Sequence, residues 1–265
     1  MKISDEVLGV LSTLEIDAPY VRITRQLDRK LYTKVNQALE ACGGEWNRKA
    51  KAHLFDGDVQ ARIDRVITTG EVTTDQDLGF FPTPLDLARQ LVEMADVRPG
   101  HIVLEPSAGE GAIVRAILER EANVVCIERE LLRRDILIGL ERRHGTVSVL
   151  DHVEDFMEYQ ATEPFDRVVM NPPFCKVGLG DHLDHVRHAF GMLVPGGILV
   201  SVFPSGIGFR QDKRHREFRE WVCAHPAPKD ETNAYKLASI TDLPEDSFKA
   251  SGTSVRTCVL RMAKP

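Results

Sequence analysis

From residue 79 onward, short apolar runs alternate with stretches in which apolar residues recur every three or four positions. The runs are rich in β-branched residues and predict buried strands at residues 101–105, 123–127, 146–150, 167–170 and 198–203. The amphipathic stretches predict helices, most clearly at residues 111–121, 130–143 and 182–193. Residues 254–261 alternate apolar and polar side chains, which suits an antiparallel strand. This order indicates a mostly parallel sheet with helices on both faces.

The first 78 residues show a different pattern. Apolar residues at helical spacing predict two helices, each of which is followed by glycine. Between these helices, residues 45–55 combine cations and aromatic residues at hairpin or loop spacing. Residues 71–78 are polar and acidic and indicate a linker. We therefore predict a small N-terminal, mainly helical unit at residues 1–78 and an α/β domain at residues 79–265.

Composition narrows the class of protein. The chain has 265 residues, of which 43% are hydrophobic and 28% are charged, as in globular proteins. Its apolar runs are shorter than the ~18 residues of a membrane span, and its start lacks the pattern of a signal peptide. We expect a cytoplasmic protein without a membrane partner, as a monomer or a homodimer. The five cysteines are widely spaced and predict neither a zinc site nor disulfides.

The segment Asn171-Pro172-Pro173-Phe174 directly follows the predicted strand 167–170. In open parallel sheets, ligands bind outside the carboxyl ends of the strands. The two prolines have no N–H and a fixed φ, so the turn is stiff. Such a turn fits a flat ring with an exocyclic amino group. The carbonyl oxygens of Asn171 and Pro172 would accept its hydrogens, and Phe174 would stack on the ring.

A loop of small residues follows the predicted strand 101–105. Its residues allow a ligand to approach the backbone closely: Ser107, Ala108, Gly109 and Gly111. The third glycine of a dinucleotide fingerprint is missing, and Glu105 and Glu110 would repel a pyrophosphate. This acidic rim suits a cationic ligand, such as a sulfonium with an α-amino group. Glu128, after the second strand, is placed to bind ribose hydroxyls, with a solvated helix cap as the alternative.

Two further segments have the chemistry of a binding site. Asp155 can accept the hydrogens of an adenine amine while Phe156 covers the ring, although Asp151 competes for the first role. Thr83 is predicted to cap a helix that has Pro84 at its first position. The Thr83 hydroxyl can also bind a carboxylate at this helix start.

Charged and histidine-rich stretches give weaker signals. One candidate nucleic-acid patch combines Trp46 with the cations Arg48, Lys49 and Lys51. A second contains Arg210, Lys213, Arg214, Arg216 and Arg219. We favour the second, because its loop should overhang the same edge as Asn171. Three histidines recur every three residues and raise the possibility of a metal, but helix packing or solvation is the better interpretation: His182, His185 and His188.

These motifs, taken in order, resemble S-adenosylmethionine-dependent amino-methyltransferases that act on adenine N6 of DNA. The resemblance covers about residues 79–203, with plausible closing strands to 262, and fits the subgroup in which a Phe-x-Thr-Pro segment precedes the glycine loop. It implies a Rossmann-like class I methyltransferase fold with a mostly parallel seven-stranded sheet and an antiparallel terminal strand. It also implies S-adenosylmethionine as cofactor, S-adenosylhomocysteine as product, no metal, and DNA as partner.

The resemblance assigns roles to individual residues. The catalytic residues would be Asn171, Pro172, Pro173 and Phe174. The cofactor would contact Phe81, Thr83, Glu105, Ser107, Ala108, Gly109, Gly111, Glu128, Asp155, Phe156 and Asn171. Two features depart from the family. Such enzymes commonly carry a large C-terminal target-recognition domain, whereas this sequence ends soon after the predicted sheet closes, which weakens the expectation of sequence-specific DNA recognition. Phe174 replaces the commoner tyrosine and retains stacking.

Other functions fit parts of the pattern. With the same fold, the substrate could be an RNA base amine, cytosine N4 or a protein glutamine. A non-catalytic nucleic-acid-binding module would retain the fold without the reaction. A nicotinamide-dependent oxidoreductase is the third alternative, and the incomplete glycine motif argues against it.

Overall fold

The structure is a computed structural model that describes residues 2–55, 59–72, 81–153, 155–174, 182–225, 239–249 and 256–265. Its contacts divide the chain into two compact units, Met1–Leu78 and Gly79–Pro265. Most of the predicted linker, residues 73–78, lies outside the described residues. None of the helices in the described part of the chain has the length and apolar character needed to cross a bilayer.

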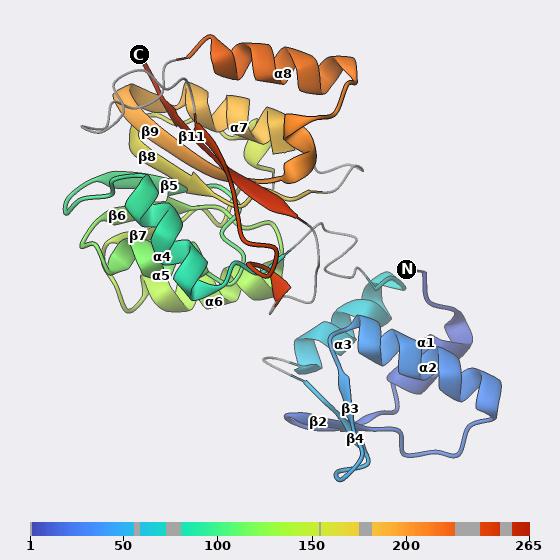
Figure 1. Ribbon diagram of the computed structural model, residues 1–265. Helices are drawn as coiled ribbons and strands as arrows, with labels where there is room; N and C mark the ends of the chain where they lie inside the picture. Colours follow the sequence, from blue (N-terminus) through green and yellow to red (C-terminus); the bar gives the residue numbers. More distant parts are fainter. Residues whose placement is uncertain are drawn as a thin grey trace. The chain divides into compact units, whose positions relative to one another are not determined.

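The first unit joins three helices to a small antiparallel sheet (Figure 1). The helices are α1 (Asp5–Leu11), α2 (Arg29–Ala41) and α3 (Val59–Thr69). The strands, in sheet order, are β1 (Glu15–Asp17), β2 (Tyr20–Arg22), β4 (Ala52–Leu54) and β3 (Glu45–Asn47). Apolar residues of all three helices share one core with Val21 of β2. The two predicted helices correspond to α2 and α3, and residues 45–55 form the β3–β4 hairpin, whereas α1, β1 and β2 were not predicted.

The second unit contains a seven-stranded sheet. Its strands, in spatial order, are β10 (Ser239–Asp242), β11 (Thr257–Ala263), β9 (Leu193–Pro204), β8 (Phe165–Met170), β5 (Ile102–Glu105), β6 (Asn123–Cys126) and β7 (Val147–Val149). Strands β5 to β9 are parallel, whereas β11 is antiparallel to both of its neighbours. The fold class predicted from the sequence is confirmed. Strand β10 was not predicted, and residues 254 and 255 of the predicted last strand lie outside the described residues.

Helices cover both faces of this sheet (Figure 1). One face carries α4 (Leu85–Met94), α5 (Ala112–Leu118) and α6 (Leu131–Glu141), and the other carries α7 (His182–Gly191) and α8 (Lys213–Cys223). Successive strand residues therefore enter different cores. In β5, for example, Val103 packs with the α4–α6 layer and Leu104 with the α7–α8 layer. Strands buried on both faces read as continuous apolar runs, which is why the sequence predicted them.

Candidate active site

The glycine loop joins β5 to α5 and is attached to the end of β6. The Ala108 N–H donates to the Ile127 carbonyl at 2.9 Å, and the Ile127 N–H donates to the Glu105 carbonyl at 3.0 Å. Gly111 precedes α5 in the left-handed region, with φ of 80°. A Cβ atom at Gly111 would come within 2.9 Å of Leu137 in α6. Glycine is therefore required there both for the backbone conformation and for the close packing of α6.

Glu105, the last residue of β5, carries a fully buried carboxyl group. Its Oε1 accepts a hydrogen bond from the Ser107 N–H at 3.0 Å. Within the described residues, Glu105 Oε2 and the buried Ser107 hydroxyl have no hydrogen-bond partner. Burial raises the pKa of Glu105 well above its usual range; the Ser107 N–H opposes this shift, and the nearby Glu128 adds to it. Unpartnered buried polar atoms are rare in folded proteins, and these two fit a ligand with cationic or hydrogen-donating groups.

Glu128 lies just after β6 and is also buried. Its carboxylate accepts hydrogen bonds from the N–H groups of Gly109 at 2.7 Å and Glu130 at 2.8 Å. Burial raises the pKa of Glu128, while the Glu130 N–H and the charge of Arg133 oppose that shift. Because a carboxylate oxygen has two lone pairs, each oxygen retains one for a ribose hydroxyl. The ribose contact stays a prediction, and the structure adds a second role, which is to hold the glycine loop against β6.

Asn171 follows β8, the strand beside β5 in the sheet. Its Nδ2 donates to the Phe81 carbonyl at 3.0 Å and to the Thr83 hydroxyl at 3.1 Å. A carbonyl can only accept, so the contact with Phe81 fixes which end of the amide is the NH2 group. Asn171 Oδ1 is buried and has no hydrogen-bond partner in the described part of the chain. A fixed acceptor thus lies at the same sheet edge as the glycine loop.

Thr83 differs from its predicted role. The cap of α4 is Pro84, no side chain caps this helix, and α4 begins at Leu85. The prediction of Thr83 as a helix cap was therefore wrong. Its hydroxyl instead accepts the hydrogen bond from Asn171, which is 88 residues away in sequence. Local sequence could not reveal a partner at that separation.

The aromatic side chains near Asn171 pack against each other. The Phe174 ring lies 5.6 Å from the Phe81 ring and 6.1 Å from the His182 ring, measured between centroids. Phe174 is half-buried, so part of the side chain remains open for stacking. Phe81, which was predicted to contact the cofactor, therefore contacts the 171–174 turn through both its ring and its carbonyl.

Asp155 and Phe156 lie in a short helical turn after β7, where the role of Asp155 stays a prediction and that of Phe156 changes. Asp155 Oδ1 accepts a hydrogen bond from the Met157 N–H at 2.9 Å and caps the short 3-10 helix η1 (Phe156–Glu158). The Phe156 side chain is only 4% exposed, and the rings of His188 and His185 lie 4.9 and 5.5 Å from it. Phe156 is thus enclosed by protein. This corrects the expectation that its face covers an adenine ring.

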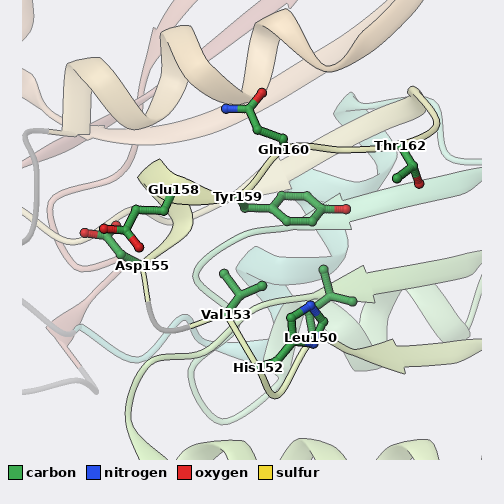
Figure 2. A pocket seen from close by; sticks show the side chains of 8 residues that line it. All are labelled: Leu150, His152, Val153, Asp155, Glu158, Tyr159, Gln160 and Thr162. Atoms are coloured by element: carbon green, nitrogen blue, oxygen red, sulfur yellow. The ribbon is translucent and has the colours of Figure 1, made fainter.

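A hollow of about 510 Å³ lies beside this turn (Figure 2). It is lined by Leu150, His152, Val153, Asp155, Glu158, Tyr159, Gln160 and Thr162. Figure 2 shows Asp155 and Glu158 at one end of this set and Thr162 at the other. The lining comes from the segment after β7, and among the described residues it includes no member of the glycine loop or of the 171–174 turn.

Arg134 is a site residue that we did not predict. This arginine of α6 is 9% exposed, and its guanidinium donates to the carbonyls of Glu128 at 2.9 Å, Arg129 at 3.1 Å and Asp151. It therefore joins the loop after β6 to the loop after β7. An arginine among the inward-facing residues of an amphipathic helix was the available signal.

The three histidines of α7 pack inside the protein. His182 and His185 are buried, and the half-buried His188 places Nε2 2.9 Å from the Tyr159 carbonyl. His182 contacts the Phe203 ring at 5.4 Å. The described residues contain no cluster of metal-ligating side chains. These contacts agree with the helix-packing interpretation of the three residues.

The two predicted cationic patches lie on different elements. Trp46 is in β3, and Arg48, Lys49 and Lys51 occupy the turn between β3 and β4. In the second unit, Arg210 precedes α8, and Lys213 and Arg214 are its first residues. The second patch was expected in a loop, and the structure corrects this to the start of a helix.

No protein-family model matches the chain. A ribosomal RNA small subunit methyltransferase A from Protochlamydia amoebophila is 40% identical over 47 residues, which are 18% of this chain and 16% of that protein. A candidate ribosomal RNA small subunit methyltransferase A from Methanopyrus kandleri is 34% identical over 85 residues, 32% of this chain and 30% of that protein. The chain thus spans less than a third of the length of each curated relative.

Solved structures share the fold at low sequence identity. A candidate class I S-adenosylmethionine-dependent methyltransferase from Listeria monocytogenes has a TM-score of 0.54 and 14% identity, over 98% of this chain and 79% of that chain. The modification subunit of a candidate type I restriction enzyme from Vibrio vulnificus has a TM-score of 0.58 and 18% identity, over 89% of this chain and 53% of that chain. The second unit therefore has the class I methyltransferase fold.

Proposed function

We propose that this protein transfers a methyl group from S-adenosylmethionine to an exocyclic amine of a nucleic-acid base, with adenine N6 in DNA as the favoured substrate. The observation that carries the proposal is the fixed amide of Asn171, whose Nδ2 is bound by Phe81 and Thr83 while the buried Oδ1 lacks a partner. An oriented acceptor without a donor is what a base amine requires.

The residues around the glycine loop fit a sulfonium cofactor. The unpartnered Glu105 Oε2 and Ser107 hydroxyl can accept hydrogen bonds from an amino-acid moiety, and Glu128 retains lone pairs for ribose hydroxyls. The raised pKa of Glu105 reflects the burial of its carboxyl group. S-adenosylmethionine, when bound, supplies an electrophilic methyl group on a positively charged sulfur.

Asn171 and Pro172 would prepare the amine for attack. The nitrogen of a base amine is a poor nucleophile because its lone pair is delocalised into the ring. Hydrogen bonds from both of its N–H groups to Asn171 Oδ1 and the Pro172 carbonyl would favour a pyramidal nitrogen and stabilise the positive charge that develops on it. Preorganised polar groups of this kind contribute about 3–4 kcal/mol each to transition-state stabilisation in acyl transfer. The half-buried Phe174 would stack on the base and offset part of the cost of unstacking it.

The reaction balances without a metal or an oxidant. The nitrogen lone pair forms the new C–N bond, and the electron pair of the broken C–S bond remains on sulfur as a neutral thioether. The methylated amine then carries the positive charge and loses one proton. The proton becomes acidic only after transfer, so water can accept it.

A methyltransferase for an RNA base amine is the second candidate. It is favoured by the two curated relatives, which are described as ribosomal RNA methyltransferases. DNA is favoured by the order of the motifs from Phe81 to Phe174, and the Vibrio vulnificus modification subunit shares the fold. The two candidates use the same acceptors, so the substrate must be identified by experiment.

The test is incubation of the protein with methyl-labelled cofactor and separate pools of DNA, RNA and protein, followed by identification of the modified product. We expect label in DNA as N6-methyladenine. Label in RNA alone would establish the second candidate. Absence of label from all three pools, with the cofactor bound, would overturn methyl transfer as the function.

A further inference from the structure

The two cationic patches differ in how their charges are neutralised. We call Arg210, Lys213 and Arg214, which are three of the five cations in the second patch, the α8 cluster. Each of its members has a carboxylate partner: Arg210 lies 3.7 Å from Asp212, Lys213 lies 3.7 Å from Glu217, and Arg214 contacts Asp184. A nearby carboxylate lowers the net positive charge that such a cation presents to a phosphate. We therefore expect the α8 cluster to bind phosphate less well than unpaired cations do.

The hairpin surface consists of Trp46, Arg48, Lys49 and Lys51. Its three cations are exposed, and none is ion-paired to any carboxylate that the structure describes. Glu45, next to Trp46 in β3, points to the opposite face of the sheet because successive strand residues alternate. The positive charge of this turn is thus available to an anionic partner.

The backbone of the turn is fixed by local interactions. Asn47 Oδ1 accepts hydrogen bonds from the N–H groups of Lys49 at 3.0 Å and Ala50 at 3.1 Å. Lys51 adopts the left-handed conformation, with φ of 49°, and returns the chain into β4. The cations therefore project from a preformed turn, which lowers the entropy lost when a ligand binds.

Trp46 adds an aromatic surface beside these cations. It lies on β3, an edge strand of the sheet, and 44% of its surface is exposed. The His53 ring supports it edge-on at 5.1 Å, and His53 is itself fixed by a contact of 2.9 Å to Asn36 Oδ1. Trp46 is thus held on one side and open on the other, so an unpaired base can stack on it.

We propose that the hairpin surface binds a nucleic-acid strand that has at least one unpaired base. Arg48, Lys49 and Lys51 contact phosphates, and Trp46 stacks on the base. The observations favour nucleic acid because a flat, braced aromatic beside several unneutralised cations provides both interactions that single strands use. This inference rests on the proposed function only for the class of substrate, since it concerns the first unit by itself and requires no methyl transfer.

The test measures binding of a short single-stranded oligonucleotide to the full chain at several salt concentrations. The hairpin variant carries Arg48→Gln, Lys49→Gln and Lys51→Asn, because asparagine tolerates the left-handed backbone. Each phosphate contact to a single strand contributes about 0.7 to the slope of log K against log salt. We expect this variant to lose about two units of slope and about 100-fold in affinity at ~0.1 M salt.

The matched control removes the same charge from the other patch. The α8 variant carries Arg210→Gln, Lys213→Gln and Arg214→Gln, and we expect its affinity to stay within about threefold of the wild type. At position 46, Trp46→Phe should retain stacking, whereas Trp46→Leu should weaken binding about tenfold. In the wild type, the oligonucleotide should quench part of the indole fluorescence. This quenching should be absent in Trp46→Phe, whose only tryptophan is Trp221.

Several results would overturn the proposal. Unchanged binding by the hairpin variant, with a melting curve like that of the wild type, would remove this surface from nucleic-acid contact. An equal loss in the α8 variant would show that only net charge matters. If the hairpin variant loses binding to vesicles of anionic phospholipid but keeps its affinity for the oligonucleotide, the surface binds membranes and not nucleic acid. If no methyl transfer is found but the hairpin variant still loses oligonucleotide affinity, the proposed function fails and this inference stands.

Discussion

Two loops at the same edge of the sheet carry similar sequence signals but expose different chemistry. The loop after β8 contains Asn171 and Phe174, and the loop after β7 contains Asp155 and Phe156, so each pairs a polar residue with an aromatic one. In the first loop the amide oxygen has no described partner and the aromatic ring is half-buried. In the second loop the carboxylate caps η1 and the aromatic ring is enclosed by the core.

The difference shows what makes a polar residue available to a ligand. Asn171 is held through its donor group by a segment distant in sequence, and this leaves its acceptor unused. In Asp155, by contrast, Oδ1 accepts a hydrogen bond from the nearby Met157 N–H. A carboxylate that caps its own loop has a structural explanation for that contact, whereas a buried acceptor that is oriented from outside and lacks a partner among the described residues calls for a functional one.

The largest effect should come from Asn171→Ala. The variant removes the acceptor that would stabilise charge on the amine, and a loss of about 3–4 kcal/mol corresponds to a rate several hundredfold lower. Cofactor affinity should stay within about tenfold, because the glycine loop is unchanged. Initial rates with labelled cofactor and calorimetric titration of the cofactor measure the two quantities. Full activity of the variant would remove Asn171 from the mechanism.

A second large effect should come from Glu105→Gln, which tests whether the β5 loop presents an unused acceptor as the β8 loop does. A hydrogen bond to a charged group contributes about 1.5–3 kcal/mol, so we expect the dissociation constant of the cofactor to rise about 10- to 100-fold. An unchanged dissociation constant would exclude Glu105 from the cofactor site.

The same variant should change how stability depends on pH. Burial raises the pKa of Glu105 above its ordinary value of 4.5, so the folded chain binds this proton more tightly than the unfolded chain. The wild type therefore loses stability as the pH rises from about 4.5 towards the raised pKa. Glu105→Gln lacks this group. Its free energy of unfolding, relative to that of the wild type, should therefore increase as the pH rises. Denaturant unfolding at several pH values measures the difference, and a constant difference would contradict the raised pKa.

A smaller effect should come from Thr83, which orients Asn171 without being placed at the reacting amine. Thr83→Val keeps the shape of the side chain and removes the hydroxyl that accepts from Asn171 Nδ2. One neutral hydrogen bond contributes about 0.5–1.5 kcal/mol, so we expect a rate up to about tenfold lower. Thr83→Ser should restore the rate because it returns the hydroxyl. If Thr83→Val keeps the wild-type rate while Thr83→Ser lowers it, Thr83 acts through its methyl group and not through Asn171.

The sequence predicted the sheet better than the details of the site. Strands buried on both faces gave continuous apolar runs, and the motifs located Asn171 and Glu105 at strand ends, which the structure shows to be neighbours in the sheet. The partner of Thr83 and the carbonyls bound by Arg134 were not predictable, because they depend on contacts between distant segments. Phe156 was misassigned for a related reason. An aromatic residue at a strand end has the same sequence signal whether it faces a cleft or the core.

The smallest effect on activity should come from Asp155→Ala. Because Asp155 Oδ1 caps η1, its removal should lower the free energy of unfolding by about 1 kcal/mol, while the rate of methyl transfer and the cofactor dissociation constant change less than about threefold. Asp155→Asn should recover the stability, since asparagine also caps helices. Thermal unfolding, initial rates and cofactor titration measure the three quantities. A rise of tenfold or more in the cofactor dissociation constant for Asp155→Ala would support the adenine-binding role of Asp155, because the loss of a cap that only stabilises η1 should not weaken cofactor binding. The two strand-end loops would then both contribute acceptors to the reaction, and satisfaction by a local N–H would no longer separate a structural residue from a functional one.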